Sequence, residues 1–358
     1  MSQADNYRID SHKLIYHPHR VAQWLDGKVI YPLYLEISPA GACNHRCTFC
    51  ALDYTGYQPR FLDSATLTTL VNELGPLGVG SIMYAGEGEP LLHPDIAAIV
   101  SQTRSAGIDV AITTNGVKLV PQLAEQLLPH LSWIKISIDA GSPGQYAAIH
   151  RTRAEEFHTV IANIEAAARL IRDNGWRCVL GTQALLLPEN AAELEALAAL
   201  VKAAGARYLV IKPYSHNPGS QTSCYAQLDY APFLDMKAKL ECYNDDNFTV
   251  VFRVNALQKS LQAERGYERC RALPFWSYID SLGQVWGCSA HMGDDRFLYG
   301  NVNEESFKDI WSGARRKASL DFVSLDLNPE HCRVNCRMDE INRYLWELRH
   351  PSAHVNFI

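Results

Sequence analysis

The feature that most constrains this 358-residue chain is a group of three closely spaced cysteines, Cys43, Cys47 and Cys50. Three and then two residues separate them, and the alternating, strand-like run 33–37 comes shortly before them. Thiolates at this spacing can converge on one iron–sulfur cube, and three protein ligands leave one of its four irons open. A zinc site, with His45 as a further ligand, is the alternative. We favour the iron–sulfur cluster because no second Cys-x2-Cys pair follows nearby.

Strand-like and helix-like patterns alternate after residue 33. The expected strands are 33–37, 81–85, 108–113, 133–138, 178–186 and 207–212, and the expected helices are 64–75, 95–106, 119–128, 155–173, 190–204 and 231–243. Six successive βα units predict a parallel sheet with crossover helices. Chemistry in such sheets collects at the carboxyl ends of the strands, and the cysteine loop follows the first strand.

Further polar and glycine residues follow the later strands. Gly86 and Gly88 allow a backbone to approach a ligand closely, and Glu89 can accept a hydrogen bond from an ammonium group. Other polar side chains near strand ends are Thr114, Asn115, Ser137, Asp139 and Gln183. Helix capping is the alternative role for the asparagine and the aspartate. We expect these side chains to form a ligand-facing rim.

The cysteine loop, with the aromatic Phe49 before its last cysteine, resembles the Cys-x3-Cys-x-aromatic-Cys loop of the radical SAM superfamily. Gly86–Pro90 is similar to the family's loop that contacts the amino group of S-adenosylmethionine (SAM). The resemblance implies a SAM-binding 4Fe–4S cluster on the three cysteines and a partial (β/α)6 TIM-type barrel over residues 33–243, after a lead-in, 1–32. It implies SAM contacts from Phe49, Gly86, Gly88, Glu89, Thr114, Asn115, Ser137, Asp139, Arg151 and Gln183.

A second cysteine group, Cys270, Cys288, Cys332 and Cys336, lies near the carboxyl terminus. A hairpin signal separates the first two: Tyr278–Asp280 and Gln284–Trp286 flank a Ser-Leu-Gly turn. The pattern resembles the SPASM/Twitch appendage of radical SAM enzymes, which implies a small α+β iron–sulfur region over 244–358. The same resemblance implies one auxiliary 4Fe–4S cluster on these four cysteines. A tetrahedral zinc site is the alternative.

Composition limits the cellular setting and the partners. The net charge of −6 argues against a nucleic-acid substrate, and the chain has no apolar run long enough to cross a membrane. The polar amino terminus lacks the apolar core of a secretion signal, so we expect a cytoplasmic location. Ten cysteines then indicate metal ligation or catalysis rather than disulfides. A flavodoxin or ferredoxin is the expected reductant.

Candidate catalytic residues are Lys212, Glu189, Tyr214, Cys178 and Cys224. Lys212 ends the sixth strand, where it and Glu189, Tyr214 or His216 can bind an anionic or hydroxylated substrate or move a proton. The alternative is that the lysine extends to solvent. Either cysteine can donate a hydrogen atom in an epimerisation, although packing is the commoner role of a lone cysteine.

The resemblance implies an enzyme that reduces SAM to a 5′-deoxyadenosyl radical and abstracts hydrogen from an unactivated carbon. We expect a small hydroxylated metabolite as substrate (a sugar, aminocyclitol or nucleoside), with dehydrogenation, elimination, decarboxylation or epimerisation as the outcome. Such enzymes occur in natural-product and antibiotic biosynthesis. A peptide maturase is the first alternative, disfavoured because residues 1–32 are too short for a peptide-recognition module. A non-catalytic iron–sulfur carrier or redox sensor is the second.

Overall fold

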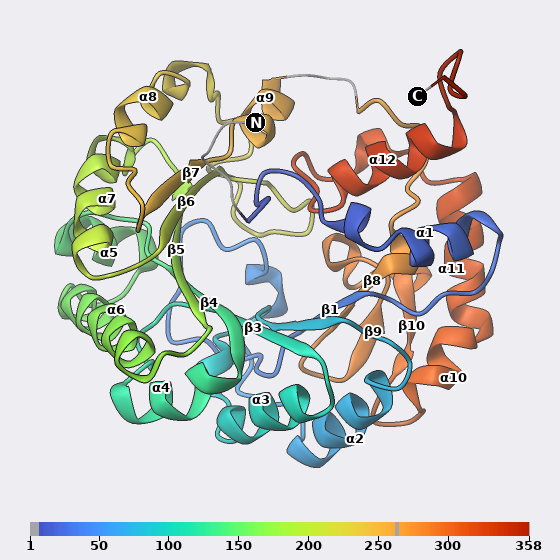
Figure 1. Cartoon of the computed structure of the whole chain (residues 1–358), viewed down its shortest axis with the longest axis horizontal. Coiled ribbons are helices and arrows are strands. Elements are labelled where there is room, and N and C mark those ends of the chain that lie inside the picture. Colours follow the sequence, from blue (N-terminus) through green and yellow to red (C-terminus); the bar gives the residue numbers. More distant parts are fainter. Residues whose placement is uncertain (1–6, 262–264, 358) are drawn as a thin grey trace.

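The computed structural model describes residues 7–261 and 265–357 (Figure 1). Within these residues one ten-stranded sheet has the order β10-β9-β8-β1-β2-β3-β4-β5-β6-β7. The strands are β1 Tyr34–Ile37, β2 Ser81–Tyr84, β3 Asp109–Thr114, β4 Leu131–Ser137, β5 Val179–Leu186, β6 Tyr208–Pro213, β7 Thr249–Phe252, β8 Trp276–Ile279, β9 Gln284–Trp286 and β10 Leu298–Asn301. The α-helices are α1 Pro18–Leu25, α2 Ser64–Leu74, α3 Ile96–Ser105, α4 Pro121–Leu127, α5 Pro143–His150, α6 Glu155–Asn174, α7 Leu194–Ala203, α8 Met236–Glu241, α9 Val254–Leu261, α10 Phe307–Ser312, α11 Ala314–Leu325 and α12 Asp339–Arg349.

Strands β1 to β7 are parallel to their neighbours and curve into an open barrel, with helices α2 to α8 along its outer side (Figure 1). The two faces of each strand differ in burial. On β4, Ile134 and Ile136 are fully buried, whereas Trp133, Lys135 and Ser137 are only half-buried. Because side chains alternate along a strand, the isoleucines pack under the helices and the other three face the barrel lumen.

The predicted partial (β/α)6 barrel is confirmed, and each of the six expected strands is present. Two helices differ from expectation. Helix α5 was not predicted, and the expected helix 231–243 is a short 3-10 turn followed by α8. Ser142 caps α5 by accepting a hydrogen bond from Gln145 N, and Pro143 occupies its first position. In the described part of the chain, no helix is long and apolar enough to span a bilayer.

The carboxyl-terminal region continues the barrel sheet rather than standing apart from it. Strand β8 runs parallel to β1, pairing Tyr34 with Trp276 and Glu36 with Tyr278, and β9 and β10 extend the sheet antiparallel. This pairing satisfies the backbone groups on the outer edge of β1, which would otherwise be an exposed sheet edge. On the opposite edge of the sheet, β7 pairs with β6 although it lies beyond residue 243. The domain boundary itself stays a prediction.

Helix α10 fastens this region to the barrel. Glu73 of α2 accepts hydrogen bonds from the backbone N of Phe307 and Lys308, at 2.9 and 2.8 Å. The buried Trp311 donates from Nε1 to Ile30 O at 2.7 Å and stacks on Phe307. These contacts join the barrel, the lead-in and the carboxyl-terminal region through one helix.

Trp311→Ala should therefore destabilise the protein strongly. The change deletes a fully buried ring and leaves Ile30 O without its donor, and such losses cost about 3–5 kcal/mol. Urea denaturation followed by circular dichroism measures the change. Leu325→Ala on α11, where the side chain is 70% exposed, is the control and should stay within about 0.5 kcal/mol of the parent. Equal effects of the two substitutions would contradict the fastening role of α10.

Candidate iron–sulfur and SAM site

The loop that carries Cys43, Cys47 and Cys50 is held from two sides at the carboxyl end of β1. Glu89 N donates to Ala42 O at 2.8 Å, just before the first cysteine. On the other side Arg46 N and Thr48 N donate to the carbonyls of His150 and Ile149 at the end of α5, at 3.1 and 2.9 Å. The loop is thus fixed by backbone bonds between the β2 and β4 connections.

Burial raises the pKa of all three thiols. It raises the pKa of Cys43 to about 12, and the pKa values of Cys47 and Cys50 also lie above the ordinary thiol value. The thiolate of Cys50 further raises the pKa of Cys43, and those of Cys43 and Cys50 raise that of Cys47, so the three sulfurs converge. A metal cation offsets such a penalty, since a coordinating thiol is deprotonated outright. The thiol cluster therefore fits an iron–sulfur centre.

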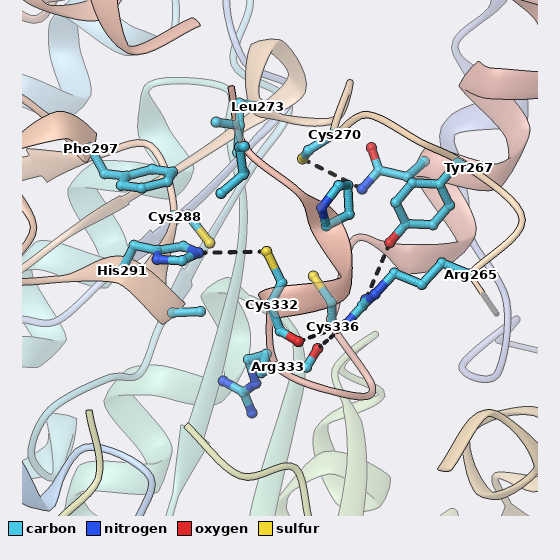
Figure 2. A pocket seen from close by; sticks show the side chains of 14 residues that line it. Arg265, Tyr267, Cys270, Leu273, Cys288, His291, Phe297, Cys332, Arg333 and Cys336 are labelled. Carbon is cyan, nitrogen blue, oxygen red and sulfur yellow. Dashed lines mark hydrogen bonds between the residues drawn. The ribbon is translucent and has the colours of Figure 1, made fainter. Parts of the chain in front are cut away.

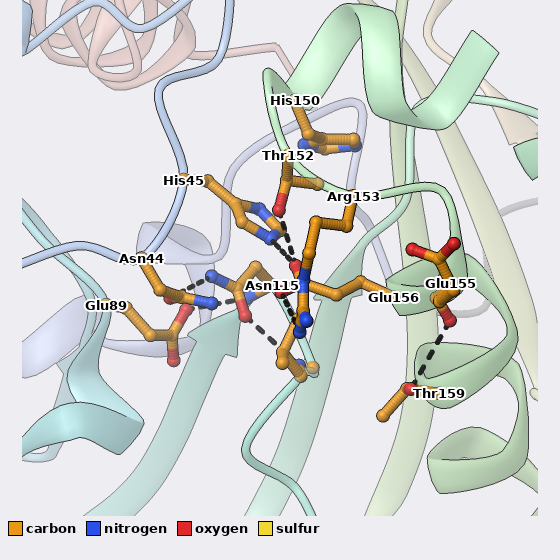
Figure 3. Close-up of polar contacts among 12 residues, drawn as sticks. Asn44, His45, Glu89, Asn115, His150, Thr152, Arg153, Glu155, Glu156 and Thr159 are labelled. Atoms are coloured by element: carbon orange, nitrogen blue, oxygen red, sulfur yellow. Dashed lines mark hydrogen bonds and ion pairs between the residues drawn. The ribbon is translucent and has the colours of Figure 1, made fainter. Parts of the chain in front are cut away.

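Two polar atoms in this loop lack partners. Asn44 Nδ2 and His45 Nδ1 are buried and have no hydrogen bond to any described residue. Their other polar atoms are engaged: Asn44 Oδ1 accepts from Asn115 Nδ2 at 2.8 Å, and His45 Nε2 lies 2.9 Å from Glu156 Oε2 (Figure 3). Buried polar groups normally have a partner, so these atoms are suited to a bound polar ligand such as SAM. Sequence reasoning gave Asn44 no role, although it lies inside the motif.

His150 is a second residue that sequence reasoning did not assign. The Asp139 backbone N–H donates to His150 Nε2 at 3.3 Å, so the imidazole proton lies on Nδ1. Nδ1 is 3.2 Å from Cys47 Sγ and points its N–H at that sulfur. Burial lowers the pKa of His150 to about 3, which keeps the ring neutral. Phe49 packs edge-on against this ring, with centroids 5.9 Å apart.

The glycines after β2 are required by close packing between loops. Gly86 has φ of +123°, and a Cβ there would lie 2.6 Å from the Ser38 Cβ and 2.5 Å from the Tyr278 hydroxyl. A Cβ on Gly88 would lie 2.0 Å from Ala42 O. A larger residue at position 88 would displace this segment from the cysteine loop, and one at position 86 would displace it from Ser38 and Tyr278. Their predicted contact with SAM stays a prediction.

Glu89 is buried at the centre of a hydrogen-bond network. Its carboxylate accepts from Thr114 Oγ1 at 2.5 Å, from Asn115 N at 2.8 Å and from Leu91 N at 3.0 Å. Burial raises its pKa above the ordinary carboxyl value, and these donors oppose that shift. Glu89 thus joins the ends of β2 and β3 beside the cysteine loop. Its predicted contact with the SAM ammonium is untested.

The remaining predicted SAM contacts fall into two groups. Ser137, Gln183 and Asp139 face the lumen side of the β4 and β5 ends: Gln183 Nε2 donates to Ser137 Oγ at 2.8 Å, and Leu185 N donates to Asp139 Oδ1 at 2.6 Å. Arg151 differs, because it is the exposed residue that ends α5, with φ of +48°. The residue of this pair that contacts the cysteine loop is His150, and the role of Arg151 stays a prediction.

Most predicted catalytic residues gather at the barrel mouth. Lys212 Nζ donates to Gln183 Oε1 at 3.3 Å, and Glu189 accepts a hydrogen bond from the Tyr225 hydroxyl. That hydroxyl also lies 3.0 Å from Thr48 Oγ1 of the cysteine loop. The backbone N–H of the buried Tyr214 donates a hydrogen bond to the Tyr230 hydroxyl at 2.6 Å.

The two candidate hydrogen-donor cysteines lie in different places. The exposed Cys224 has its Sγ 3.7 Å from Thr48 O, beside the cysteine loop. Cys178 precedes β5 at the amino-terminal edge of the sheet and is packed in the hydrophobic core. The eight residues of β5 separate it from the opposite edge, about 25 Å away. This position argues against the predicted hydrogen-donor role of Cys178.

The four sulfur-bearing residues of the second cysteine group line one cavity (Figure 2). Burial raises the pKa of Cys270 to about 12 and that of Cys332 to about 11, and the pKa values of Cys288 and Cys336 also rise. Asn342 Nδ2 lies 3.5 Å from Cys270 Sγ, and His291 Nε2 lies 3.6 Å from Cys332 Sγ. Four converging thiols with nearby N–H donors fit the predicted auxiliary cluster.

Arg333 joins this cavity to the barrel mouth. It lies between Cys332 and Cys336, yet its Nε donates to Ser215 Oγ at 2.9 Å and its Nη2 donates to Ser215 O at 3.1 Å, just after β6. The auxiliary site is therefore anchored to the segment that leaves the lumen. This contact between the auxiliary cysteine site and the segment after β6 was not predicted from the sequence.

The two cysteine sites and the partial barrel define an iron–sulfur protein that binds SAM. Family models agree: that of the radical SAM superfamily matches residues 37–201, and that of the SPASM iron–sulfur cluster-binding domain matches residues 270–337. The chain belongs to the radical SAM superfamily and is a radical SAM enzyme with a carboxyl-terminal SPASM/Twitch domain. Its cofactors are SAM, the 4Fe–4S cluster that binds it, and auxiliary iron–sulfur chemistry in the SPASM domain.

Individual relatives match parts of the chain. The GTP 3′,8-cyclase of Chlorobaculum tepidum is 37% identical over 129 residues, which are 36% of this chain and 38% of that protein. The GTP 3′,8-cyclase of Microcystis aeruginosa is 37% identical over 177 residues, 47% of this chain and 52% of that protein. The chain thus spans about half or less of these curated relatives. The structure of Streptococcus suis SuiB bound to the precursor peptide SuiA has the same fold, with a TM-score of 0.65, 19% identity and coverage of 84% and 69%.

Metal analysis tests the two-cluster assignment. Replacing Cys43, Cys47 and Cys50 together by Ala should reduce the iron of the anaerobically reconstituted protein from about eight to about four atoms per chain. Replacing Cys178 and Cys242, which belong to neither group, is the matched control and should leave the iron unchanged. Iron, zinc and acid-labile sulfide are measured together. Zinc at one equivalent in the triple variant would instead make the second site a zinc site.

Removing the His150 imidazole should shift the reduction potential of the SAM-binding cluster. His150→Phe deletes an N–H donor to a cluster sulfur, so we expect a more negative potential, by on the order of 50 mV. His150→Gln, which keeps an N–H donor, should restore part of the difference. EPR-monitored redox titration measures the potential, with His158→Phe on the exposed side of α6 as control. An unchanged potential in His150→Phe would show that the N–H does not reach the ligand sulfur.

Proposed function

We propose that this enzyme removes a hydrogen atom from a small hydroxylated metabolite held in the barrel lumen. The observation that carries this proposal is the hydrogen-bonded series Ser137–Gln183–Lys212, which crosses β4, β5 and β6 on the lumen face. A hydroxyl, an amide and an ammonium in this order offer both donors and acceptors. A sugar, aminocyclitol or nucleoside presents the complementary groups at similar spacing.

The loop 214–228 supports a compact substrate. Asp53 of the cysteine loop accepts hydrogen bonds from Gln221 N and Thr222 N, both at 2.8 Å, and from Ser220 Oγ at 3.0 Å. At its other end the loop is held by Arg333 through Ser215. The loop thus bridges the two cysteine sites at the mouth of the lumen. A bridge of this kind limits the room for an extended peptide and helps to exclude water from the site.

The chain's own residues have separate tasks in this reaction. When bound, the cluster and SAM supply a 5′-deoxyadenosyl radical, the cofactor chemistry of the family. Ser137 and Gln183 orient the substrate hydroxyls, because orientation decides which hydrogen is removed. Burial lowers the pKa of Lys212 to about 8, so its amine can hold or release a proton near neutral pH. Glu189, which accepts a hydrogen bond from Tyr225, is the candidate partner of Lys212 for proton transfer. Cys224 is the candidate donor of a hydrogen atom to the substrate radical.

Named relatives point to two substrate classes. The curated relatives are cyclases of GTP by name, and a nucleotide is a small hydroxylated metabolite. The similar SuiB structure holds a precursor peptide, so a peptide is the alternative substrate class in the experiment below. We also infer a flavodoxin or ferredoxin as reductant and a reducing compartment such as the cytoplasm, where seven ligand thiols remain free of disulfides.

The decisive measurement is 5′-deoxyadenosine release by the anaerobically reconstituted enzyme with a chemical reductant. Panels of sugars, aminocyclitols, nucleosides, nucleotides and precursor peptides are compared with SAM alone. We expect one metabolite class to raise release several-fold, and Cys47→Ala to abolish it. Stimulation by peptides alone would replace the proposal with peptide maturation. Absence of release from protein with full iron content would contradict hydrogen abstraction altogether.

A further inference from the structure

We propose that the substrate carries an anionic group, a carboxylate or a phosphate, which binds in the lumen between Lys135 of β4 and Lys212 of β6. The proposal deepens the proposed function, because it uses the same lumen for the substrate. It assigns a binding role to Lys135, which lies two residues before Ser137 on the same face of β4. It also gives Lys212 a partner for its charge.

The side chain of Lys135 is a cation without an anion. Within the described residues its Nζ has no hydrogen bond or ion pair. Its contacts are with the faces of two rings, Trp133 at 5.0 Å and Tyr208 at 5.9 Å from the ring centroids. Such cation–π contacts orient an ammonium and leave its three donors free. A half-buried ammonium in this state is available to an incoming anion.

Aromatic rings lie close to this lysine at one end of the lumen. Lys135 pairs with Gly181 of β5. The Tyr208 ring covers Gly181, since a Cβ on Gly181 would lie 2.0 Å from that ring. Tyr7 packs against Tyr208 from below, with ring centroids 5.4 Å apart. Aromatic side chains therefore surround Lys135 at the amino-terminal end of the lumen, and Lys212 lies four residues nearer the barrel mouth than Tyr208 on β6.

Lys212 lies on the same face of β6 as Tyr208, because side chains alternate along a strand. Its hydrogen bond to Gln183 Oε1 is long, at 3.3 Å, and the Gln183 amide in turn donates to Ser137 Oγ at 2.8 Å. An ammonium has three donors, so two remain for a ligand. Burial, and then nearby positive charge, lowers the pKa of Lys135 to about 7 and that of Lys212 to about 8, and Lys212 is one of the charges that act on Lys135. A bound anion would relieve this repulsion.

The acidic groups of the lumen supply that charge only in part. Asp10 is paired with Arg253 at 3.2 Å, and Glu36 is paired with Arg337. Asp139 accepts a hydrogen bond from Leu185 N and acts as an opposite charge on Lys212, although burial raises the pKa of this carboxyl to about 7. Among the described residues, no acidic group acts in this way on Lys135. With both lysines protonated, the lumen between β4 and β6 therefore has an excess of positive charge. A substrate carboxylate or phosphate would balance it.

Turnover with paired substrates tests the proposal. Each neutral metabolite of the 5′-deoxyadenosine assay is matched with its phosphorylated form and with its uronate form, which separates the two sources of negative charge. We expect stimulation by one charged form over its neutral parent. Lys135→Gln and Lys212→Gln should each raise the KM for that substrate by about 10- to 100-fold, as expected when a hydrogen bond to a charged group is lost. Lys202→Gln, which breaks an ion pair with Asp245 on the outer side, is the control.

A labelling experiment supplies a readout that is independent of turnover. The reconstituted enzyme is treated with a limiting amine-acylating reagent, and labelling of Lys135 and Lys202 is quantified by peptide mass spectrometry. Pyrophosphate and malonate serve as probes for phosphate and carboxylate binding. One of them should lower Lys135 labelling several-fold and leave Lys202 unchanged.

The outcomes separate this proposal from the proposed function. Protection of Lys135 without stimulation by any metabolite would keep the anion site and reject the metabolite reaction. The anion site is overturned if a substrate turns over and both lysine variants keep the parent KM. It is equally overturned if no substrate turns over and neither probe protects Lys135.

Discussion

Hydrogen bonding on both edges of β1 is the constraint on which the rest of the structure depends. One edge pairs with β2 and begins the parallel barrel, whereas the other pairs with β8 and begins the auxiliary region. The carboxyl end of the same strand leads into the cysteine loop. A four-residue strand thus sets the position of both cysteine sites. Shifting its register by one residue would turn its lumen-facing side chains outward and misplace each site.

Two buried groups of thiols are costly in the absence of metal. Burial raises the pKa of all seven cysteines, and like charges within each group raise these values further. The protein therefore couples cluster binding to its own stability, because ligation removes an electrostatic penalty that folding creates. His150, Asn342 and His291 place nitrogen atoms within 3.6 Å of the sulfurs, where N–H donors can orient the thiolate ligands.

Different strands contribute different polar groups around the lumen. Asn44 and His45, in the loop after β1, present unpartnered polar atoms, whereas β4 to β6 carry the hydroxyl, amide and lysine side chains. The loop 214–228, which follows β6, contacts Asp53 after the cysteine loop and Arg333 of the auxiliary site. In the proposed function, the loop after β1 serves the cofactor, and β4 to β6 serve the substrate.

The sequence alone determined the class of protein, because cysteine spacing, glycine loops and the alternation of strands and helices are local patterns. Cys43, Cys47, Cys50 and the expected strands were readable from it. Tertiary structure decided what depends on contacts between distant segments. The family resemblance implied a SAM contact for Arg151, which the fold leaves exposed, whereas its neighbour His150, to which the sequence gave no role, lies against Cys47. The sequence gave Lys135 no distinguishing feature, because Gly181, Tyr208 and Lys212 become its neighbours only in the folded sheet. Pairing of β8 with β1 was equally hidden, because about 240 residues of chain separate two strands that share an edge.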